Sequence, residues 1–314
     1  MVFHDAITME EMCDTYDAFI LDQFGVLHDG NTSSPGALNC IHELAARGKK
    51  MIILSNTSRR ASHVLERLST TYGFPAKDFI GAITSGEEAH GYLKEHPIGT
   101  KCTWITRKDG SVQYVQDDLG LRLVDIEEAE FILVHGTESV FTSASEKLDL
   151  DFLQSGKMHS SLKAILTRGI ARGLPLVCCN PDYITHAPDG SVHHMPGKLQ
   201  DWYAKKGGET ISFGKPHAEH FHTCVEALDL SEGERVAHVG DSLLHDVAGA
   251  TASGVDSIFV ANGVHAEALN ICAKDGREAE LDTELLDDLF EEVGEKPTYT
   301  VPCFAWSVDA IPTA

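Results

Sequence analysis

The feature that most constrains this chain is a series of short apolar segments, each followed by a polar residue and then by an amphipathic stretch. The clearest are Ala18–Leu21 before Asp22, Met51–Leu54 before Ser55, and Arg235–Val239 before Gly240-Asp241. Short apolar runs are typical of strands buried on both faces, and their alternation with helices favours a parallel sheet. The pattern therefore predicts a doubly wound α/β protein, with helices on both faces of the sheet.

The alternation occurs in two parts of the chain, separated by a segment with elements of its own. Both parts contain predicted helices and further strands, namely Pro35–Arg47, Ser62–Leu68, Phe79–Ile83, Thr210–Phe213, Ala218–Leu228, Asp246–Ser253 and Ser257–Val260. The middle segment has strand-like runs and one helix, at Lys101–Thr106, Glu130–Val134, Leu174–Cys179 and Leu162–Arg172. We interpret residues 1–83 and 205–314 as one Rossmann-like core, with an inserted α/β cap domain at 84–204.

The charge balance excludes two classes of partner. Asp and Glu total 48 against 25 Lys and Arg, which gives a net charge of −23. A nucleic-acid groove or an anionic membrane would need clustered basic residues, so neither is expected as a partner. A phosphate group can still bind locally, through a metal ion, a lysine and backbone N–H groups.

The chain also gives expectations about its compartment. Its first residues, MVFHDAITMEEM, lack the basic start and apolar run of a signal peptide. No uncharged apolar stretch approaches the roughly 20 residues that a membrane helix needs. The eight cysteines include no CxxC pair, which favours reduced thiols. We therefore expect a cytoplasmic protein.

Four polar residues follow predicted core strands, and they suit one kind of chemistry. They are Asp22, Ser55, Lys215 and Asp241. Ligands of open parallel sheets bind beyond the carboxyl ends of the strands, where these side chains should meet. A carboxylate can attack phosphorus, two carboxylates can hold Mg²⁺, and a lysine and a hydroxyl can hold phosphoryl oxygens. The set predicts a phosphoryl-transfer site.

The spacing of these residues resembles the four ordered motifs of the haloacid-dehalogenase superfamily. The matching segments are Asp22-Gln23-Phe24-Gly25-Val26-Leu27, Ser55-Asn56, Gly214-Lys215-Pro216 and Gly240-Asp241-Ser242-Leu243-Leu244-His245-Asp246. The insertion between the second and third motifs, together with Asn180-Pro181-Asp182 and the Gly-Lys-Pro form, resembles the NagD-like type IIA branch. This resemblance implies a hydrolase that uses Mg²⁺ and acts on a small phosphorylated molecule.

The resemblance also implies a role for each matching residue. Asp22 would be the nucleophile and a metal ligand, and the backbone carbonyl of Phe24 would be a second ligand. Asp241 would bind Mg²⁺ directly, while Asp246 would support the metal through water or by orienting Lys215. Lys215 would neutralise the nucleophile and the phosphoryl group. The residues expected to face the substrate are Ser55, Asn56, Asn180, Asp182 and Lys215.

Residue 24 departs from the pattern of the superfamily's phosphatases, which usually have a second Asp two residues after the nucleophile. That Asp protonates the leaving oxygen, and Phe24 cannot move a proton. Four residues could stand in for it, although each is more simply a loop residue: His28, Asp29, His186 and His193. Three interpretations therefore stay open: a phosphatase, a weakly catalytic or inactive binding protein, and a haloacid dehalogenase. The substrate and the oligomeric state, including a homo-oligomer, also stay open.

Overall fold

The computed structural model describes residues 4–5, 8–187, 189–271 and 281–307, and the chain divides into two compact units. The first unit comprises Met1–Ser55, Ala61–Ile83 and Lys215–Ala314. The second comprises Asn56–Arg60 and Thr84–Gly214. Each unit has a sheet and an apolar core of its own, which is the arrangement expected of separate folding units.

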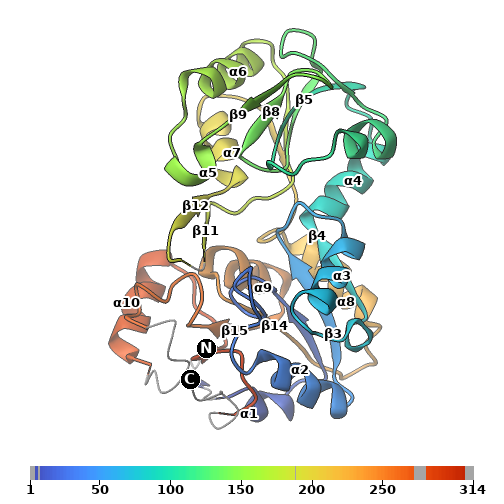
Figure 1. Cartoon of the computed structure of the whole chain (residues 1–314). Helices are drawn as coiled ribbons and strands as arrows, with labels where there is room; N and C mark the ends of the chain where they lie inside the picture. Colours follow the sequence, from blue (N-terminus) through green and yellow to red (C-terminus); the bar gives the residue numbers. More distant parts are fainter. Residues whose placement is uncertain (1–3, 6–7, 188, 272–280, 308–314) are drawn as a thin grey trace. The chain divides into compact units, whose positions relative to one another are not determined.

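The sheet of the first unit has the strand order β1-β16-β15-β14-β2-β3-β4 (Figure 1). These strands are β1 (His4–Asp5), β2 (Ala18–Leu21), β3 (Lys50–Ser55), β4 (Gly81–Thr84), β14 (Val236–Gly240), β15 (Asp256–Val260) and β16 (Tyr299–Val301). From β1 to β3 every neighbouring pair is parallel. The strand order passes from β14 to β2, so two distant parts of the sequence are neighbours at the centre of the sheet.

Strand β2 shows why its sequence is apolar at every position. Phe19 and Leu21 pack into one apolar cluster, whereas Ala18 and Ile20 pack into another. Alternate side chains of a strand point to opposite faces, so both faces of this strand are covered. The α/β fold with a parallel sheet that the sequence predicted is therefore confirmed.

Amphipathic helices supply the apolar residues that cover these two faces. Helix α2 (Ala37–Ala46) contributes Cys40, Ile41 and Leu44 to the cluster that contains Phe19. Helix α8 (Ala218–Leu228) contributes Phe221, Cys224 and Leu228 to the cluster that contains Ile20. The remaining helical elements of this unit are α1 (Met9–Cys13), α3 (Ala61–Thr70), the 3₁₀ turn η1 (Ala76–Asp78), the π-helical turn η3 (Leu243–Val247), α9 (Ala248–Ser253) and α10 (Thr283–Val293).

The second unit has a mixed sheet in the order β13-β10-β7-β5-β8-β9, with β6 paired to β5. Its strands are β5 (Lys101–Thr106), β6 (Arg122–Leu123), β7 (Phe131–Val134), β8 (Ser139–Phe141), β9 (Lys147–Asp149), β10 (Leu176–Cys178) and β13 (Thr210–Ser212). Its helical elements are α4 (Ser85–Glu95), the π-helical turn η2 (Tyr114–Asp118), α5 (Phe152–Ser155), α6 (Ser160–Ala171) and α7 (Pro196–Lys205). A separate hairpin pairs β11 (Ile184–His186) with β12 (Val192–His194).

One boundary of the predicted insertion is wrong. We placed its end at residue 204 and assigned Thr210–Phe213 to the core sheet. In the structure β13 pairs in parallel with β10, so the second unit continues to Gly214. A run as short as Thr210–Ser212 can extend either of two parallel sheets, and its partner is set by tertiary contacts that periodicity does not reveal.

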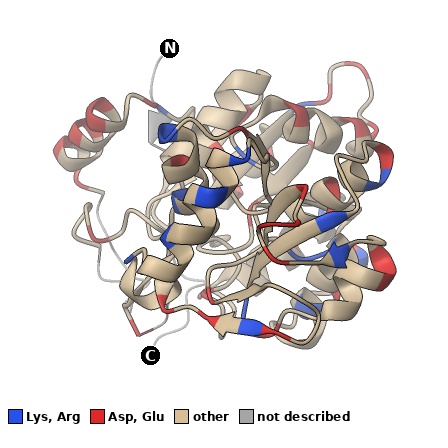
Figure 2. Ribbon diagram, turned by 90° about the horizontal axis from the view of Figure 1, so that it is seen from above, with Lys and Arg blue, Asp and Glu red and all other residues tan. Residues whose placement is uncertain are grey.

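Two general properties of the chain can be seen on the fold. Figure 2 marks Asp and Glu in red, and they are spread over many helices and loops, with Lys and Arg between them. Among the described residues, no helix is long and apolar enough to cross a membrane.

Candidate active site

Three neighbouring strands of the first unit deliver polar side chains to one edge of the sheet. Asp22 directly follows β2, Asp241 directly follows β14, and Ser55 is the last residue of β3. Leu21 is in register with Val239 on one side and with Ile53 on the other, so these three strands end at nearly the same level. The convergence that the strand ends predicted is therefore present in the structure.

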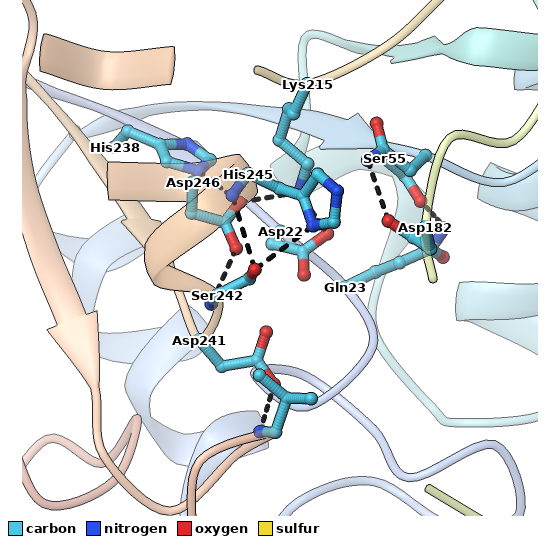
Figure 3. Close-up of polar contacts among 12 residues, drawn as sticks. Asp22, Gln23, Ser55, Asp182, Lys215, His238, Asp241, Ser242, His245 and Asp246 are labelled. Carbon is cyan, nitrogen blue, oxygen red and sulfur yellow. Dashed lines mark hydrogen bonds and ion pairs between the residues drawn. The ribbon is translucent and has the colours of Figure 1, made fainter. Parts of the chain in front are cut away.

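Three buried carboxylates form the centre of this edge. The ligand oxygens of Asp22, Asp241 and Asp246 all lie within 4.8 Å of one another (Figure 3). Like charges this close repel, and they repel more strongly in a buried setting than in water. A cation is the simplest partner for such a set, and carboxylate oxygens are the ligands that Mg²⁺ prefers.

Lys215 supplies one positive charge to this cluster. Its Nζ lies 2.7 Å from Oδ1 of Asp22 and 2.6 Å from Oδ1 of Asp246, and its side chain is 3% exposed. Burial alone would lower the pKa of Lys215, but the two carboxylates raise it above its usual range. Lys215 therefore stays charged, and it is directed at the residue expected to be the nucleophile.

Asp246 accepts hydrogen bonds on both of its oxygens. Its Oδ1 is 2.7 Å from Nε2 of His238 as well as 2.6 Å from Lys215, and its Oδ2 accepts the backbone N–H of Ser242 at 2.9 Å. Burial would raise the pKa of Asp246, but the charge of Lys215 and the hydrogen bond from His238 hold it well below its usual range. Asp246 is thus a fixed anion.

Asp22 and Asp241 are in a different electrostatic state. Burial raises the pKa of Asp22 to about 7, with Lys215 opposing the shift and Asp246 adding to it. Burial and the negative charges of Asp22 and Asp246 raise the pKa of Asp241 well above its usual range. With all three aspartates ionised, the cluster has three negative charges against the one positive charge of Lys215.

Two glycines allow the chain to pass close to Asp241. Gly25 has a φ of +84°, and a Cβ atom built on it would lie 2.0 Å from Oδ2 of Asp241. A Cβ atom on Gly263 would lie 2.2 Å from the Cβ of Asp241. The next residue, Val264, donates its N–H to Oδ2 of Asp241 at 2.8 Å. The absence of side chains at 25 and 263 makes room for this carboxylate.

Gln23 and His238 are contacts of the site that the sequence analysis did not single out. Gln23 donates from Nε2 to Oγ of Ser55 at 2.5 Å, and its Oε1 lies 3.4 Å from Nε2 of His28. Gln23 stands beside the expected nucleophile, which was an available signal. His238 is a polar residue inside the apolar run of β14, and that mismatch was a second signal.

Other candidate residues lie in the second unit, where they contact one another. Asn56 donates from Nδ2 to Oδ1 of Asp182 at 2.8 Å, and Oδ1 of Asn180 accepts the backbone N–H of Asp182 at 3.0 Å. Ser55 belongs to the first unit and Asn56 to the second, so the division between the units falls inside the predicted Ser55-Asn56 motif.

The residues considered as substitutes for the missing acid have structural surroundings of their own. His28 stacks on Tyr72 with ring centroids 4.0 Å apart, and burial lowers the pKa of His28 to about 4. Asp29 accepts the backbone N–H groups of residues 31 and 32 in an exposed turn. His186 and His193 lie on the β11–β12 hairpin of the second unit.

Comparison with known families identifies the kind of protein. A model of haloacid dehalogenase-like hydrolases matches residues 19–121, and a model described as HAD-hydrolase-like matches residues 212–289. Together the two matches span more than half of the chain and include the strand ends described above. The chain belongs to the haloacid-dehalogenase-like hydrolases. No curated protein matches its sequence.

Solved structures share the fold of this hydrolase over nearly its whole length. A haloacid dehalogenase-like hydrolase from Brucella suis is 23% identical, with a TM-score of 0.74 over 96% of this chain and all of that one. A possible sugar phosphatase from Cytophaga hutchinsonii is 19% identical, with a TM-score of 0.70 over 99% of this chain and all of that one. A p-nitrophenyl phosphatase from Archaeoglobus fulgidus is 25% identical, with a TM-score of 0.62 over 94% and 99%. Two of these three structures are thus described as phosphatases, one of them as a possible sugar phosphatase.

Proposed function

We propose that this hydrolase is a Mg²⁺-dependent phosphatase of the NagD-like branch that acts on a small phosphorylated metabolite. The single observation that carries the proposal is the placement of the Lys215 ammonium between Asp22 and Asp246, 2.7 Å from Oδ1 of Asp22. A buried nucleophilic carboxylate must be ionised when its substrate is bound, and an adjacent ammonium favours the ionised form.

The donor set fits a magnesium site. Asp22 and Asp241 would hold the ion, together with the backbone carbonyl of Phe24, and their excess negative charge supports this assignment. When bound, Mg²⁺ would neutralise phosphoryl oxygens as charge develops on them. Asp246 already accepts bonds on both oxygens, so its role is to hold Lys215.

The reaction proceeds in two displacements. A carboxylate oxygen of Asp22 attacks phosphorus, the bond to the leaving oxygen breaks, and an aspartyl-phosphate forms. Water then attacks that phosphate, releases inorganic phosphate and restores the carboxylate. Lys215 and the hydroxyl of Ser55 hold the phosphoryl oxygens during both steps. Asn56, Asn180 and Asp182, which contact one another in the second unit, are the further residues that we propose for substrate binding.

The proposal is tested with p-nitrophenyl phosphate, an activated ester. Asp22→Asn keeps the shape of the side chain but removes the nucleophile, so we expect Mg²⁺-dependent turnover to fall at least about 10³-fold. Asp14→Asn changes an exposed aspartate at the end of α1 and serves as the matched control. Full turnover by Asp22→Asn would overturn the proposal.

Phe24 gives a second test, which separates the phosphatase from the alternative functions. Its ring packs at 5.8 Å from that of His28, so it lies in a loop of defined structure. We expect the native protein to favour esters with good leaving groups, and Phe24→Asp to improve turnover of alkyl phosphates by about 10²-fold or more. Metal-independent halide release would instead support a dehalogenase. Mg²⁺ binding without turnover of any ester would support a binding protein.

A further inference from the structure

His238, at the centre of β14, is a polar residue in an otherwise apolar strand. Residue 238 lies between Ala237 and Val239, it is fully buried, and its ring packs against Phe221 with centroids 5.0 Å apart. A valine or leucine would fill such a position without a polar group to satisfy. A buried imidazole is stabilised when it finds a hydrogen-bond partner, and His238 has one in Asp246.

The hydrogen bond has a defined polarity. The Nε2 of His238 lies 2.7 Å from Oδ1 of Asp246. An ionised carboxylate can only accept hydrogen bonds, so Nε2 of His238 carries the hydrogen and donates it. The same oxygen accepts from Lys215 at 2.6 Å, and the other oxygen accepts the N–H of Ser242. Three donors from three segments of the chain therefore fix the position and the rotation of this carboxylate (Figure 3).

Fixing Asp246 has a consequence for Lys215. The ammonium lies between two carboxylates at nearly equal distances, 2.6 Å from Asp246 and 2.7 Å from Asp22. If Asp246 could rotate, Lys215 could follow it away from Asp22. His238, which bonds the same Oδ1 of Asp246, therefore acts on the nucleophile through two intermediate side chains, Asp246 and Lys215.

We propose that His238 is a positioning residue that holds Asp246 and thereby keeps the Lys215 ammonium directed at Asp22. This role rests on the proposed function, because it assumes that Asp22 is the nucleophile. His238 does not touch the reacting atoms. Its loss should therefore lower kcat and leave KM nearly unchanged, as expected of a group that orients the catalytic residues.

The kinetic test compares two replacements of different chemistry. His238→Phe keeps an aromatic ring of similar size next to Phe221 but removes the donor, and we expect kcat to fall about 10- to 100-fold. His238→Gln restores an N–H at a similar reach and should recover most of that loss. Phe221→Leu, which alters the packing against the ring but keeps the donor, is the matched control and should leave kcat and KM as they are. Thermal unfolding of each variant verifies folding.

A second readout does not use turnover. In the metal-free protein, the Nε2 hydrogen of His238 should give a proton resonance far downfield of the backbone amides, with slow exchange, because it is buried in a short bond to a carboxylate. The resonance should be missing from His238→Phe and from Asp246→Asn. Its absence from the native protein, or an unchanged kcat in His238→Phe, would overturn the positioning role.

The two proposals fail in different ways. If Asp22→Asn turns over normally, the nucleophile is wrong, and both the proposed function and the role of His238 fall. If Asp22→Asn is inactive while His238→Phe keeps the native kcat, the phosphatase stands and His238 is a packing residue. Rescue by His238→Gln together with the downfield resonance supports the positioning role.

Discussion

The three carboxylates of Asp22, Asp241 and Asp246 form one cluster, but the protein does not neutralise them in the same way. On one side, Asp246 accepts from Lys215, His238 and the backbone of Ser242, and its pKa is lowered. On the other side, Asp241 accepts from the backbone of Val264, and the nearby negative charges add to burial in raising its pKa. The ligand oxygens of the three aspartates lie within 4.8 Å of one another, yet the pKa of Asp246 is lowered and that of Asp241 is raised.

This difference in hydrogen-bond partners and pKa indicates which of the carboxylates can bind a cation. Asp246 is neutralised by groups of the protein itself, so a metal ion would have to displace existing donors to bind it. Asp22 and Asp241 share an excess of negative charge that a divalent cation would relieve. The segment Gly240–Asp246 thus contains two aspartates: Asp241, for which we propose metal binding, and Asp246, which holds Lys215.

Replacing Asp241 and Asp246 one at a time gives the largest effects that we expect from the difference between the two sides. Asp241→Asn removes a proposed metal ligand, so the Mg²⁺ concentration for half-maximal activity should rise about 100-fold or more. Asp246→Asn should lower kcat by about 10²-fold and change the Mg²⁺ requirement by less than about 5-fold, because it acts through Lys215. Mg²⁺ titrations of turnover, and calorimetric titration of the free proteins, measure both values. An equal loss of Mg²⁺ affinity in the two variants would remove the distinction.

Replacing Gly25 tests whether the close approach of its backbone to Asp241 is needed for Mg²⁺-dependent activity. Gly25→Ala places a Cβ atom on Oδ2 of Asp241, so we expect Mg²⁺-dependent turnover to fall at least about 10-fold. Gly48→Ala is the matched control, since Gly48 also has a positive φ, of +71°, but its Cβ would have no neighbour within 4 Å. Both variants should lose about 1 kcal/mol of stability through backbone strain.

The comparison with Gly48 separates strain from steric conflict. If both variants lose activity to the same extent, the effect comes from the strained backbone. If Gly25→Ala alone is impaired, the close approach to Asp241 is responsible. Urea unfolding gives the stability of each variant, and the Mg²⁺ titration gives the state of the site.

The raised pKa of Asp22 predicts how pH and metal act together. An aspartate in the unfolded chain has a pKa of about 3.9, whereas Asp22 in the fold has a pKa of about 7. The folded protein binds the extra proton between these values, so this contribution to stability is complete below about pH 4 and is lost as pH rises to about 7. Mg²⁺ competes with that proton, so its stabilising effect should increase over the same interval.

Melting curves with and without Mg²⁺ measure this effect. With the ion at about 100 times its Kd, the melting temperature should rise by roughly 5 °C at pH 8, and by much less at pH 5. In Asp22→Asn the increase with pH should be smaller, because the competing proton is gone. A Mg²⁺ shift that is the same at every pH would contradict the raised pKa.

Much of the fold followed from the sequence because local pattern and burial agree. The run Ala18–Leu21 is apolar on both faces and is a strand with those bounds, and Ala218–Leu228 is a helix with the predicted ends. Asp22, Ser55 and Asp241 were expected at one edge of the sheet because each lies at the end of a parallel strand, and the structure places them there. These features depend on short stretches of sequence and on the parallel order of the sheet.

Features that depend on distant contacts could not be predicted in this way. The pairing of β13 with β10 decides where the second unit ends, and no periodicity in residues 210–212 encodes it. The contact between His238 and Asp246 requires η3 to bring Asp246 back within hydrogen-bond distance of a side chain of β14. The hydrogen bond from Gln23 to Ser55 joins two strand ends whose side-chain directions are set by packing.

Replacing Ser242 should have the smallest effect, and it separates the role of the Ser242 hydroxyl from that of its backbone N–H, which bonds Asp246. Its hydroxyl caps η3 by accepting the N–H of His245 at 3.3 Å, whereas its own backbone N–H bonds Oδ2 of Asp246. Ser242→Ala removes the cap and keeps the backbone donor, so the free energy of unfolding should fall by about 1 kcal/mol. Because Asp246 keeps its three donors, kcat and the Mg²⁺ requirement should stay within about twofold of native. Urea unfolding and steady-state kinetics measure the two quantities, and a loss of kcat as large as that of Asp246→Asn would show that the hydroxyl, rather than the backbone, holds this side of the site.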